Sequence, residues 1–310
     1  MTTVKLSIVI PVYKSATILP NLIKEIEIAM DKLGLLGEFQ LVLVNDASPD
    51  KSWSVIKDLL KGRSYITAIS LMKNFGQHNA IMAGLKHVKG EVVVLMDDDL
   101  QHPPSQIQNL LQEIKKGADV CYVKYKNRQH PAWKKIGSAF NNWMATKLLD
   151  KPAGLYLSSF KALDQKVILE ILKYEGPFTY IDGLILDVTR SINTVEIEHH
   201  ERADGTGNYN FKKSISLWLK MATSFSIFPL RLASIIGSIL ALLSGILIIE
   251  TVIQRLQHPE WQAGWASLFT VILFLGAAQL SFIGIVGEYL GRAYLPLNKK
   301  PQYAIKEILK

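Results

Sequence analysis

Two long apolar stretches in the last third of this 310-residue chain constrain its fold more than any other feature. Residues 230–253 carry only Arg231 and Glu250 as charges, and residues 265–287 carry none. Each stretch is long enough to cross about 30 Å of hydrocarbon as a helix. A buried hairpin in a soluble core is the alternative. Two neighbouring stretches with small residues such as Gly245 and Gly276 favour two membrane spans that pack closely.

The distribution of lysine and arginine around these stretches predicts their orientation. The basic residues that flank the two spans are Lys212, Lys213, Lys220, Arg231, Arg292, Lys299, Lys300, Lys306 and Lys310. The segment between the spans has only Arg255, together with Trp261 and Trp265 as interface anchors. Because positively charged loops stay in the cytoplasm, both termini and the N-terminal domain are expected there.

Three further segments complete the predicted domain organisation. Residues 1–210 form the cytoplasmic domain, and residues 211–228 read as an amphipathic interfacial helix with lysines on its polar side. Residues 229–290 contain the two spans. Residues 291–310 are expected to be a cytoplasmic C-terminal tail.

Strand and helix patterns alternate in the N-terminal domain. Apolar runs at residues 6–12, 39–44, 66–71, 92–96 and 120–123 are separated by segments with helical spacing at residues 17–33, 52–60, 79–87 and 104–116. This order predicts an α/β fold with a doubly wound, mostly parallel sheet. Such sheets bind ligands beyond the carboxyl ends of their strands.

Composition narrows the choice of partners. The net charge of +8 suits nucleic acid, an anionic membrane surface or a phosphorylated substrate. No basic run is interleaved with aromatic residues, so nucleic acid is not expected. The lone cysteine, Cys121, excludes an intramolecular disulfide and a multi-cysteine metal site.

The strongest chemical signal follows the run at residues 92–96, which ends in Asp97, Asp98 and Asp99. Three adjacent carboxylates repel one another unless a counter-charge is present. A divalent cation, Mg²⁺ or Mn²⁺, suits these hard oxygens and is usually shared with substrate phosphates. A solvated acidic turn is the alternative. With a sheet of this type tethered to a bilayer, the carboxylates favour transfer of a group from a soluble nucleotide to a lipid.

Six motifs carry a resemblance to a known family. They are IVIPVY at residues 8–13, VNDASPD at 44–50, NFGQHNAIMAG at 74–84, MDDDLQHPP at 96–104, FPLRL at 228–232 and GEYLGRAY at 287–294. In this order they resemble the polyprenyl-phosphate glycosyltransferases of family 2, GT-A type, which include dolichyl-phosphate mannose synthases and undecaprenyl-phosphate sugar transferases. The resemblance covers nearly the whole chain.

The resemblance implies an activity and its partners. It implies inverting transfer of a sugar from a nucleotide donor, a UDP-sugar, to a polyprenyl (undecaprenyl) phosphate at the cytoplasmic membrane face. The lipid-linked sugar would then serve modification of cell-envelope glycans or lipids. The sugar, the polyprenol length, the metal, and the choice between monomer and homo-oligomer stay open.

The resemblance also implies roles for single residues. Asp46 would accept a hydrogen bond from the base of the nucleotide. Pro11 and Tyr13 would form the wall against which the base rests. Asp97 and Asp99 would bind the metal. Gln101 would complete the metal or phosphate shell, Asp98 would have a supporting role, and Arg202 would belong to a loop that closes over phosphates. For each residue the alternative is an ordinary turn or surface position. His199 and His200 lie beside Arg202 without a third ligand at a suitable spacing.

Two departures from the family pattern concern acidic residues. Ser15 stands where relatives usually carry glutamate, and Leu155 stands where they often carry aspartate. Asp182 is a candidate replacement near the site, with a turn aspartate as the alternative. The missing acid favours a phosphate acceptor, because a phosphate monoester is largely dianionic at neutral pH and needs positioning more than a general base.

Two other functions are weighed against this one. Processive transferases usually carry a Gln-x-x-Arg-Trp motif, which the chain lacks. A degenerate transferase acting as a membrane scaffold or lipid-binding subunit is compatible with Ser15 and Leu155, but Asp97, Asp99 and Gln101 argue against it. Arg231 and the interfacial helix are expected either to hold the lipid phosphate or to anchor the chain.

Overall fold

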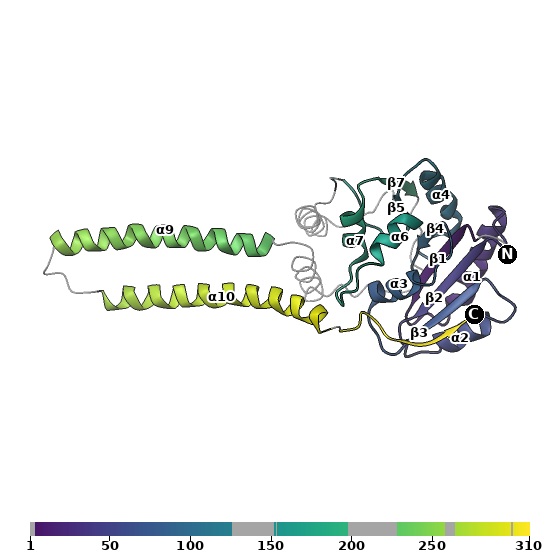
Figure 1. The fold of residues 1–310 in the computed structure, drawn as a ribbon, viewed down its shortest axis with the longest axis horizontal. Coiled ribbons are helices and arrows are strands. Elements are labelled where there is room, and N and C mark those ends of the chain that lie inside the picture. Colours follow the sequence, from purple (N-terminus) through teal and green to yellow (C-terminus); the bar gives the residue numbers. More distant parts are fainter. Residues whose placement is uncertain (1–3, 126–151, 153, 198–227, 258–263, 299) are drawn as a thin grey trace. The chain divides into compact units, whose positions relative to one another are not determined.

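The computed structural model describes residues 4–125, 152, 154–197, 228–257, 264–298 and 300–310 (Figure 1). The chain forms two compact units. The first comprises Met1–Asn208 together with Lys299–Lys310, and the second comprises Tyr209–Asn298. The chain therefore leaves the first unit once and returns to it at its C-terminal end.

The first unit is built on a mixed sheet with the strand order β7-β5-β6-β4-β1-β2-β3-β8. At its centre, β1 (Leu6–Val12) pairs in parallel with β2 (Phe39–Asn45) and β4 (Val92–Leu95), and β2 pairs in parallel with β3 (Ile66–Leu71). Every residue of β1, β2 and β3 is buried. Continuous apolar runs give strands of this kind because both faces of the sheet are covered. The predicted α/β sheet is confirmed.

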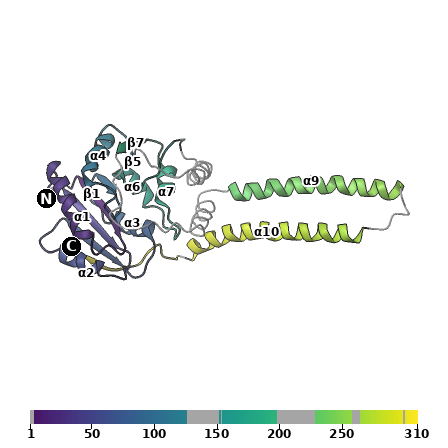
Figure 2. The same ribbon diagram turned by 180° about the vertical axis from the view of Figure 1, so that it is seen from behind.

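Helices connect the parallel strands and cover the sheet (Figures 1 and 2). They are α1 (Leu19–Lys32), α2 (Ser52–Leu59), α3 (Gln77–Leu85) and α4 (Ile107–Lys115), which a short 3₁₀ turn at Pro104–Gln106 precedes. Along α1 the buried residues recur at helical spacing: Leu19, Leu22, Ile23, Ile26, Ala29 and Met30. This single apolar stripe explains why the segment forms a helix packed on the sheet.

The other half of the sheet contains strand directions that the sequence pattern did not predict. β6 (Lys161–Asp164) runs antiparallel to β4 and to β5 (Val120–Tyr125). β7 (Ile192–Ile197) pairs in parallel with β5 at the edge. Two helices, α6 (Gln165–Ile171) and α7 (Ile181–Val188), lie between β6 and β7 in the sequence.

The C-terminal end of the chain is part of the sheet. β8 (Ile305–Leu309) pairs antiparallel with the outer edge of β3. Met72 N–H donates to Ala304 O at 2.9 Å, and Trp53 Nε1 donates to Glu307 Oε2 at 3.2 Å. The predicted C-terminal tail, residues 291–310, thus contains a strand of the sheet, because the backbone groups of the IKEIL segment pair with the edge of β3.

The second unit contains two long helices that lie antiparallel to each other, α9 (Phe228–Gln257) and α10 (Trp265–Leu297) (Figures 1 and 2). Large apolar side chains on both helices are exposed, for example Leu242 and Leu280. Among the described residues, one segment, Phe274–Leu295, is long and apolar enough to cross a membrane by length and composition. It overlaps the second predicted span at residues 274–287 and continues beyond that span to Leu295. The interfacial helix predicted at residues 211–228 lies outside the described residues, except for Phe228.

Deletion of residues 300–310 tests the structural contribution of β8. The deletion exposes the edge of β3 and removes the bonds from Met72 and Trp53, and an unpaired edge promotes aggregation. We expect the melting temperature of the purified protein to fall by about 5 °C or more, with soluble aggregates in size-exclusion chromatography.

The substitution Lys310→Ala, beyond the strand, serves as the control for this deletion. Unchanged melting and a single elution peak for the truncated protein would show that the sheet does not depend on β8.

Candidate active site

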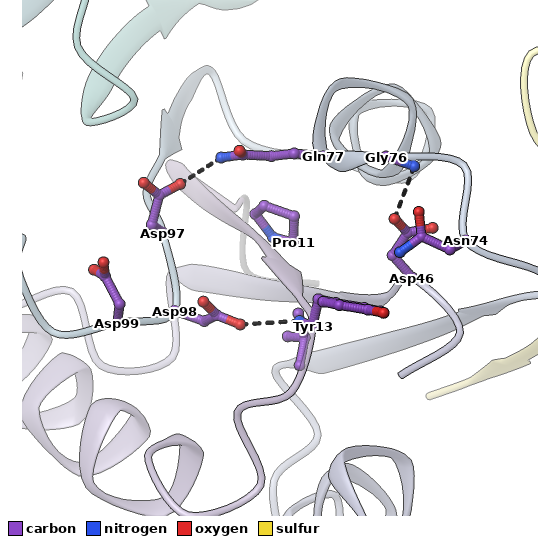
Figure 3. A pocket seen from close by; sticks show the side chains of 10 residues that line it. Pro11, Tyr13, Asp46, Asn74, Gly76, Gln77, Asp97, Asp98 and Asp99 are labelled. Carbon is purple, nitrogen blue, oxygen red and sulfur yellow. Dashed lines mark hydrogen bonds between the residues drawn. The ribbon is translucent and has the colours of Figure 1, made fainter. Parts of the chain in front are cut away.

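A pocket of about 330 Å³ lies at the carboxyl ends of β1, β2 and β4, beside the start of α3 (Figure 3). Its lining residues are Pro11, Val12, Tyr13, Asp46, Asn74, Gly76, Gln77, Asp97, Asp98 and Asp99. The structure thus brings together six of the predicted site residues, from three separate motifs. Parallel strands place their carboxyl ends on one edge of the sheet, which is why these motifs meet there.

Backbone strain is concentrated around this pocket. Among the described residues, three that are not glycine have a positive φ: Lys14 at 62°, Ala47 at 49° and Leu100 at 58°. Each lies in the loop that follows β1, β2 or β4. Such conformations cost about 1–3 kcal/mol each and persist where surrounding contacts hold them, often at functional sites.

Asp46 is buried and holds the loop that leads into α3. Its Oδ1 accepts from Phe75 N–H at 2.7 Å, and its Oδ2 accepts from Gly76 N–H at 2.9 Å. Burial raises the pKa of Asp46, and these two hydrogen bonds offset only part of that rise. Gly76 has φ +87°, a conformation that glycine adopts without steric cost. Asp46 therefore lines the pocket and also fixes the loop that precedes α3.

Asp97 is surrounded by donors from three different segments. Its Oδ1 accepts from Gln77 Nε2 at 2.6 Å, and its Oδ2 accepts from Ser159 Oγ at 2.6 Å and lies 3.4 Å from His102 Nε2. Burial pushes the pKa of Asp97 up, but the bonds from His102 and Ser159 and the charge of Lys161 outweigh it, so the pKa is lowered. The carboxylate is thereby kept ionised.

Asp98 points to the loop after β1, away from Gln77 (Figure 3). Its Oδ2 accepts from Tyr13 N–H at 3.1 Å and from the Ser15 hydroxyl group. Burial raises the pKa of Asp98, the neighbouring charge of Asp97 adds to the rise, and the bonds from Ser15 and Tyr13 oppose it. Ser15, which departs from the family pattern, is therefore the bonding partner of Asp98.

Asp99 lines the pocket, whereas Gln101 does not. Asp99 Oδ1 accepts from the backbone N–H of Gln101 at 3.1 Å, so the two residues close one turn after β4. Leu100, between them, has the positive φ that this turn requires. The predicted role of the Gln101 side chain in a metal shell stays a prediction.

The donor set fits a divalent metal that is shared with a substrate. Among the described residues, no group of three His, Cys, Asp or Glu side chains could hold a metal by itself. Asp97 and Asp99 supply two carboxylates to one pocket. Mg²⁺ is commonly bound by one or two carboxylates plus substrate phosphates, so this pair suits a metal that arrives with a diphosphate.

Asp182 is engaged elsewhere. It lies in the first turn of α7, is buried, and is not among the residues that line the pocket. Its Oδ1 accepts from Tyr122 OH at 2.9 Å and forms an ion pair with the buried Lys161 on β6. The sequence could not indicate this pairing, because the three residues come from distant segments.

The other residues singled out in the sequence are placed as follows. Leu155 is buried, with 6% of its surface exposed. Arg202, His199 and His200 lie outside the described residues, as does the side chain of Arg231. Sequence reasoning missed Gln77, His102 and Ser159 as partners of Asp97. The first two lie inside the NFGQHNAIMAG and MDDDLQHPP motifs, which was the available signal.

The buried ion pair of Lys161 and Asp182 gives a stability prediction. The substitution Lys161→Met leaves the Asp182 carboxylate buried without its counter-charge, which costs about 3–5 kcal/mol. We expect a large drop in the melting temperature of the purified protein.

The double variant Lys161→Met with Asp182→Asn is the matched control. It removes both charges and keeps an acceptor for Tyr122 OH, so most of the lost stability is expected to return. A double variant as unstable as the single one would contradict a structural role for the pair.

Comparison with known sequences identifies a shared family. The family model described as glycosyl transferase family 2 matches residues 7–171. The undecaprenyl-phosphate 4-deoxy-4-formamido-L-arabinose transferase of Enterobacter sp. (strain 638) is 35% identical over 308 residues, covering 98% of this chain and 94% of that protein. The protein of the same name from Klebsiella pneumoniae (strain 342) is 33% identical over 309 residues, covering 99% and 94%.

Solved structures share the fold of the first unit. Glucosyl-3-phosphoglycerate synthase from Mycobacterium tuberculosis, in complex with phosphoglyceric acid, aligns with a TM-score of 0.52 at 13% identity and covers 71% of this chain and 80% of that one. The same enzyme in complex with Mn²⁺, UDP-glucose and phosphoglyceric acid gives 0.50 at 14% identity, covering 70% and 78%. At these identities the likeness shows the fold alone.

Proposed function

This chain belongs to glycosyl transferase family 2 and is a glycosyltransferase, and from that premise we propose that it transfers a sugar from a UDP-sugar to undecaprenyl phosphate. The main support for this proposal is how much of the chain matches the undecaprenyl-phosphate transferases. It covers 98% of the chain and so includes the helices α9 and α10 as well as the sheet. The glucosyl-3-phosphoglycerate synthase structure covers only 71% of the chain.

The pocket supports a nucleotide-sugar donor. Tyr13 offers an exposed aromatic ring beside Pro11, which suits stacking against a base, and Asp46 lies across the pocket from Asp97 (Figure 3). In the solved relatives, the mycobacterial synthase is described in complex with UDP-glucose and Mn²⁺. On this proposal the nucleoside lies against Tyr13 and Asp46, and the diphosphate lies toward Asp97 and Asp99.

Asp97 and Asp99 would hold Mg²⁺ or Mn²⁺ together with the diphosphate, with Gln101 as the further predicted ligand. When bound, the metal neutralises the negative charge that develops on the leaving diphosphate. The residues around Asp97 suit this role: Gln77 and Ser159 bond to its two oxygens and fix its direction, and His102 and Ser159 lower its pKa against the effect of burial. Arg202 is proposed to bind phosphate from its loop.

The acceptor phosphate needs no side chain to remove a proton. Its second pKa is near 6, so it is largely dianionic at neutral pH and can attack the anomeric carbon directly, inverting it. The engagement of Asp182 by Lys161 and Tyr122 agrees with a reaction that does not require a base at that position. A sugar hydroxyl as acceptor would require one.

The fold supports membrane attachment through a helical pair. The first unit comprises the chain up to Asn208 and again from Lys299, so a hairpin that enters and leaves the bilayer on one face is compatible with this connection. The exposed apolar side chains of both helices suit lipid contact. With the lysine and arginine bias, we place the first unit at the cytoplasmic face of the inner membrane, with residues 211–228 in the interface.

No observation among the described residues favours a degenerate scaffold over an enzyme. Asp97 and Asp99, which a scaffold would not need, both line the pocket. Ser15, which replaces the usual glutamate, donates a hydrogen bond to Asp98. Leu155, which replaces the frequent aspartate, is buried.

Sugar transfer in detergent tests the proposal. Purified protein is mixed with undecaprenyl phosphate and a panel of radiolabelled UDP-sugars, including UDP-4-deoxy-4-formamido-L-arabinose, with Mn²⁺, Mg²⁺ or EDTA. We expect a lipid-linked product that requires the metal. The substitution Asp99→Ala is expected to reduce the rate of product formation at least about 100-fold. The reason is that the metal which neutralises the charge developing on the leaving diphosphate would be bound less well.

Asp58→Asn is the matched control. Asp58 lies on α2, and its exposed carboxylate forms an ion pair with Lys61, just beyond that helix. This substitution is expected to leave the rate unchanged. Product formed equally in EDTA would overturn the metal assignment. If no product forms but the protein still binds UDP, undecaprenyl phosphate is not the acceptor. If the protein neither forms product nor binds UDP, the donor is not a UDP-sugar.

A further inference from the structure

Hydrogen bonds from four consecutive backbone amides, at residues 13–16, hold the loop that follows β1. Four consecutive N–H groups donate to side chains of other segments: Tyr13 to Asp98 Oδ2 at 3.1 Å, Lys14 to Ser48 Oγ at 2.9 Å, Ser15 to Ser52 Oγ at 3.0 Å and Ala16 to Asp50 Oδ2 at 3.2 Å. Lys14 is held in the left-handed conformation in the middle of this run. The loop therefore keeps a strained shape only while these acceptors are present.

The four acceptors come from two sides. Ser48 and Asp50 lie between β2 and α2, and Ser52 is the first residue of α2, whereas Asp98 lies in the segment that follows β4. Asp98 also accepts the hydroxyl hydrogen of Ser15, so it provides two of the bonds that hold the loop. It is thus the single attachment between this loop and the carboxylate run among the described residues.

The neighbours of Asp98 point in other directions. Asp97 is bonded to Gln77 and Ser159, and Asp99 to its own turn. Figure 3 shows the Asp98 carboxylate directed to the Tyr13 backbone, while the Tyr13 ring extends toward the side of the pocket where Asp46 lies. Tyr13 as a residue is 45% exposed, and the Lys14 ammonium lies 5.6 Å from the centroid of its ring.

We infer that Asp98 is a positioning residue that, together with Ser15, fixes Tyr13 as the wall of the donor pocket and does not serve the metal. This inference rests on the proposed function, in which the nucleoside lies against Tyr13. Its structural basis is that the carboxylate accepts from both ends of the Tyr13–Ser15 segment. A small hydroxyl side chain at position 15 and an acid at position 98 fit together, because two carboxylates at this contact would repel each other.

Nucleotide binding to three variants separates this role from metal binding. Dissociation constants for UMP and UDP are measured with Mn²⁺ and with EDTA for the wild type, Asp98→Ala, Asp98→Asn and Ser15→Ala. Asp98→Ala removes both bonds, and we expect about tenfold weaker binding by the same factor with and without metal. Asp98→Asn is expected to stay within about threefold of the wild type, because its amide oxygen still accepts.

The double variant Ser15→Ala with Asp98→Ala tests the pairing. Because the two residues share a bond, we expect it to bind no more weakly than Asp98→Ala alone. A loss that occurs only with Mn²⁺, or an Asp98→Asn variant as weak as Asp98→Ala, would overturn the inference, since both results would assign the charge of Asp98 to the metal.

Hydrogen exchange in the ligand-free protein tests the same inference without a nucleotide. We expect Asp98→Ala to speed exchange at the amides of residues 13–15 at least about tenfold, and Asp99→Ala, which loses only a bond to its own turn, to leave them unchanged. Unchanged exchange in Asp98→Ala would overturn the inference. Failure of the wild type to bind UMP or UDP would instead overturn the proposed donor, while the exchange result still decides the role of Asp98.

Discussion

The site depends on the parallel pairing of β1, β2 and β4. The register places Val12 beside Asn45 and Val9 beside Leu95, so the residues that follow these strands emerge at one edge of the sheet. Four carboxylates consequently line one pocket, where they repel one another. Each is directed to its own set of hydrogen-bond donors, and these bonds offset part of the repulsion.

The same donors create the shape of the pocket. Asp46 binds the amides that lead into α3, and α3 in turn presents Gln77 to Asp97. Asp98 binds the loop after β1, and that loop carries Tyr13. The strained residues Lys14, Ala47 and Leu100 lie in the loops that these contacts hold. The carboxylates are therefore structural acceptors as well as candidate ligands, so substitutions among them are expected to change loop structure along with charge.

The C-terminal segment of the chain is bonded to the first unit at two places. Gln302, just after α10, donates to Thr179 Oγ1 at 2.7 Å and to Gly176 O at 3.1 Å, and β8 then pairs with β3. The segment before α7 is thus bonded to the segment that follows the second long helix. All of these contacts lie within the first unit, so they fix its C-terminal segment on the sheet.

Signals that are local in the sequence were enough to predict several elements. Continuous apolar runs predicted the buried strands, and helical spacing predicted α1. Three aspartates after a strand indicated a ligand site there, whereas Pro11, Tyr13 and Asp46 were indicated by the resemblance of their motifs to a known family. Which carboxylate bonds to which partner depends on the folded structure. Asp98 reaches Tyr13 across 85 residues, Asp182 reaches Lys161 across 21, and β8 finds β3 after the two long helices. These contacts depend on strand register and direction, which periodicity along the chain does not encode.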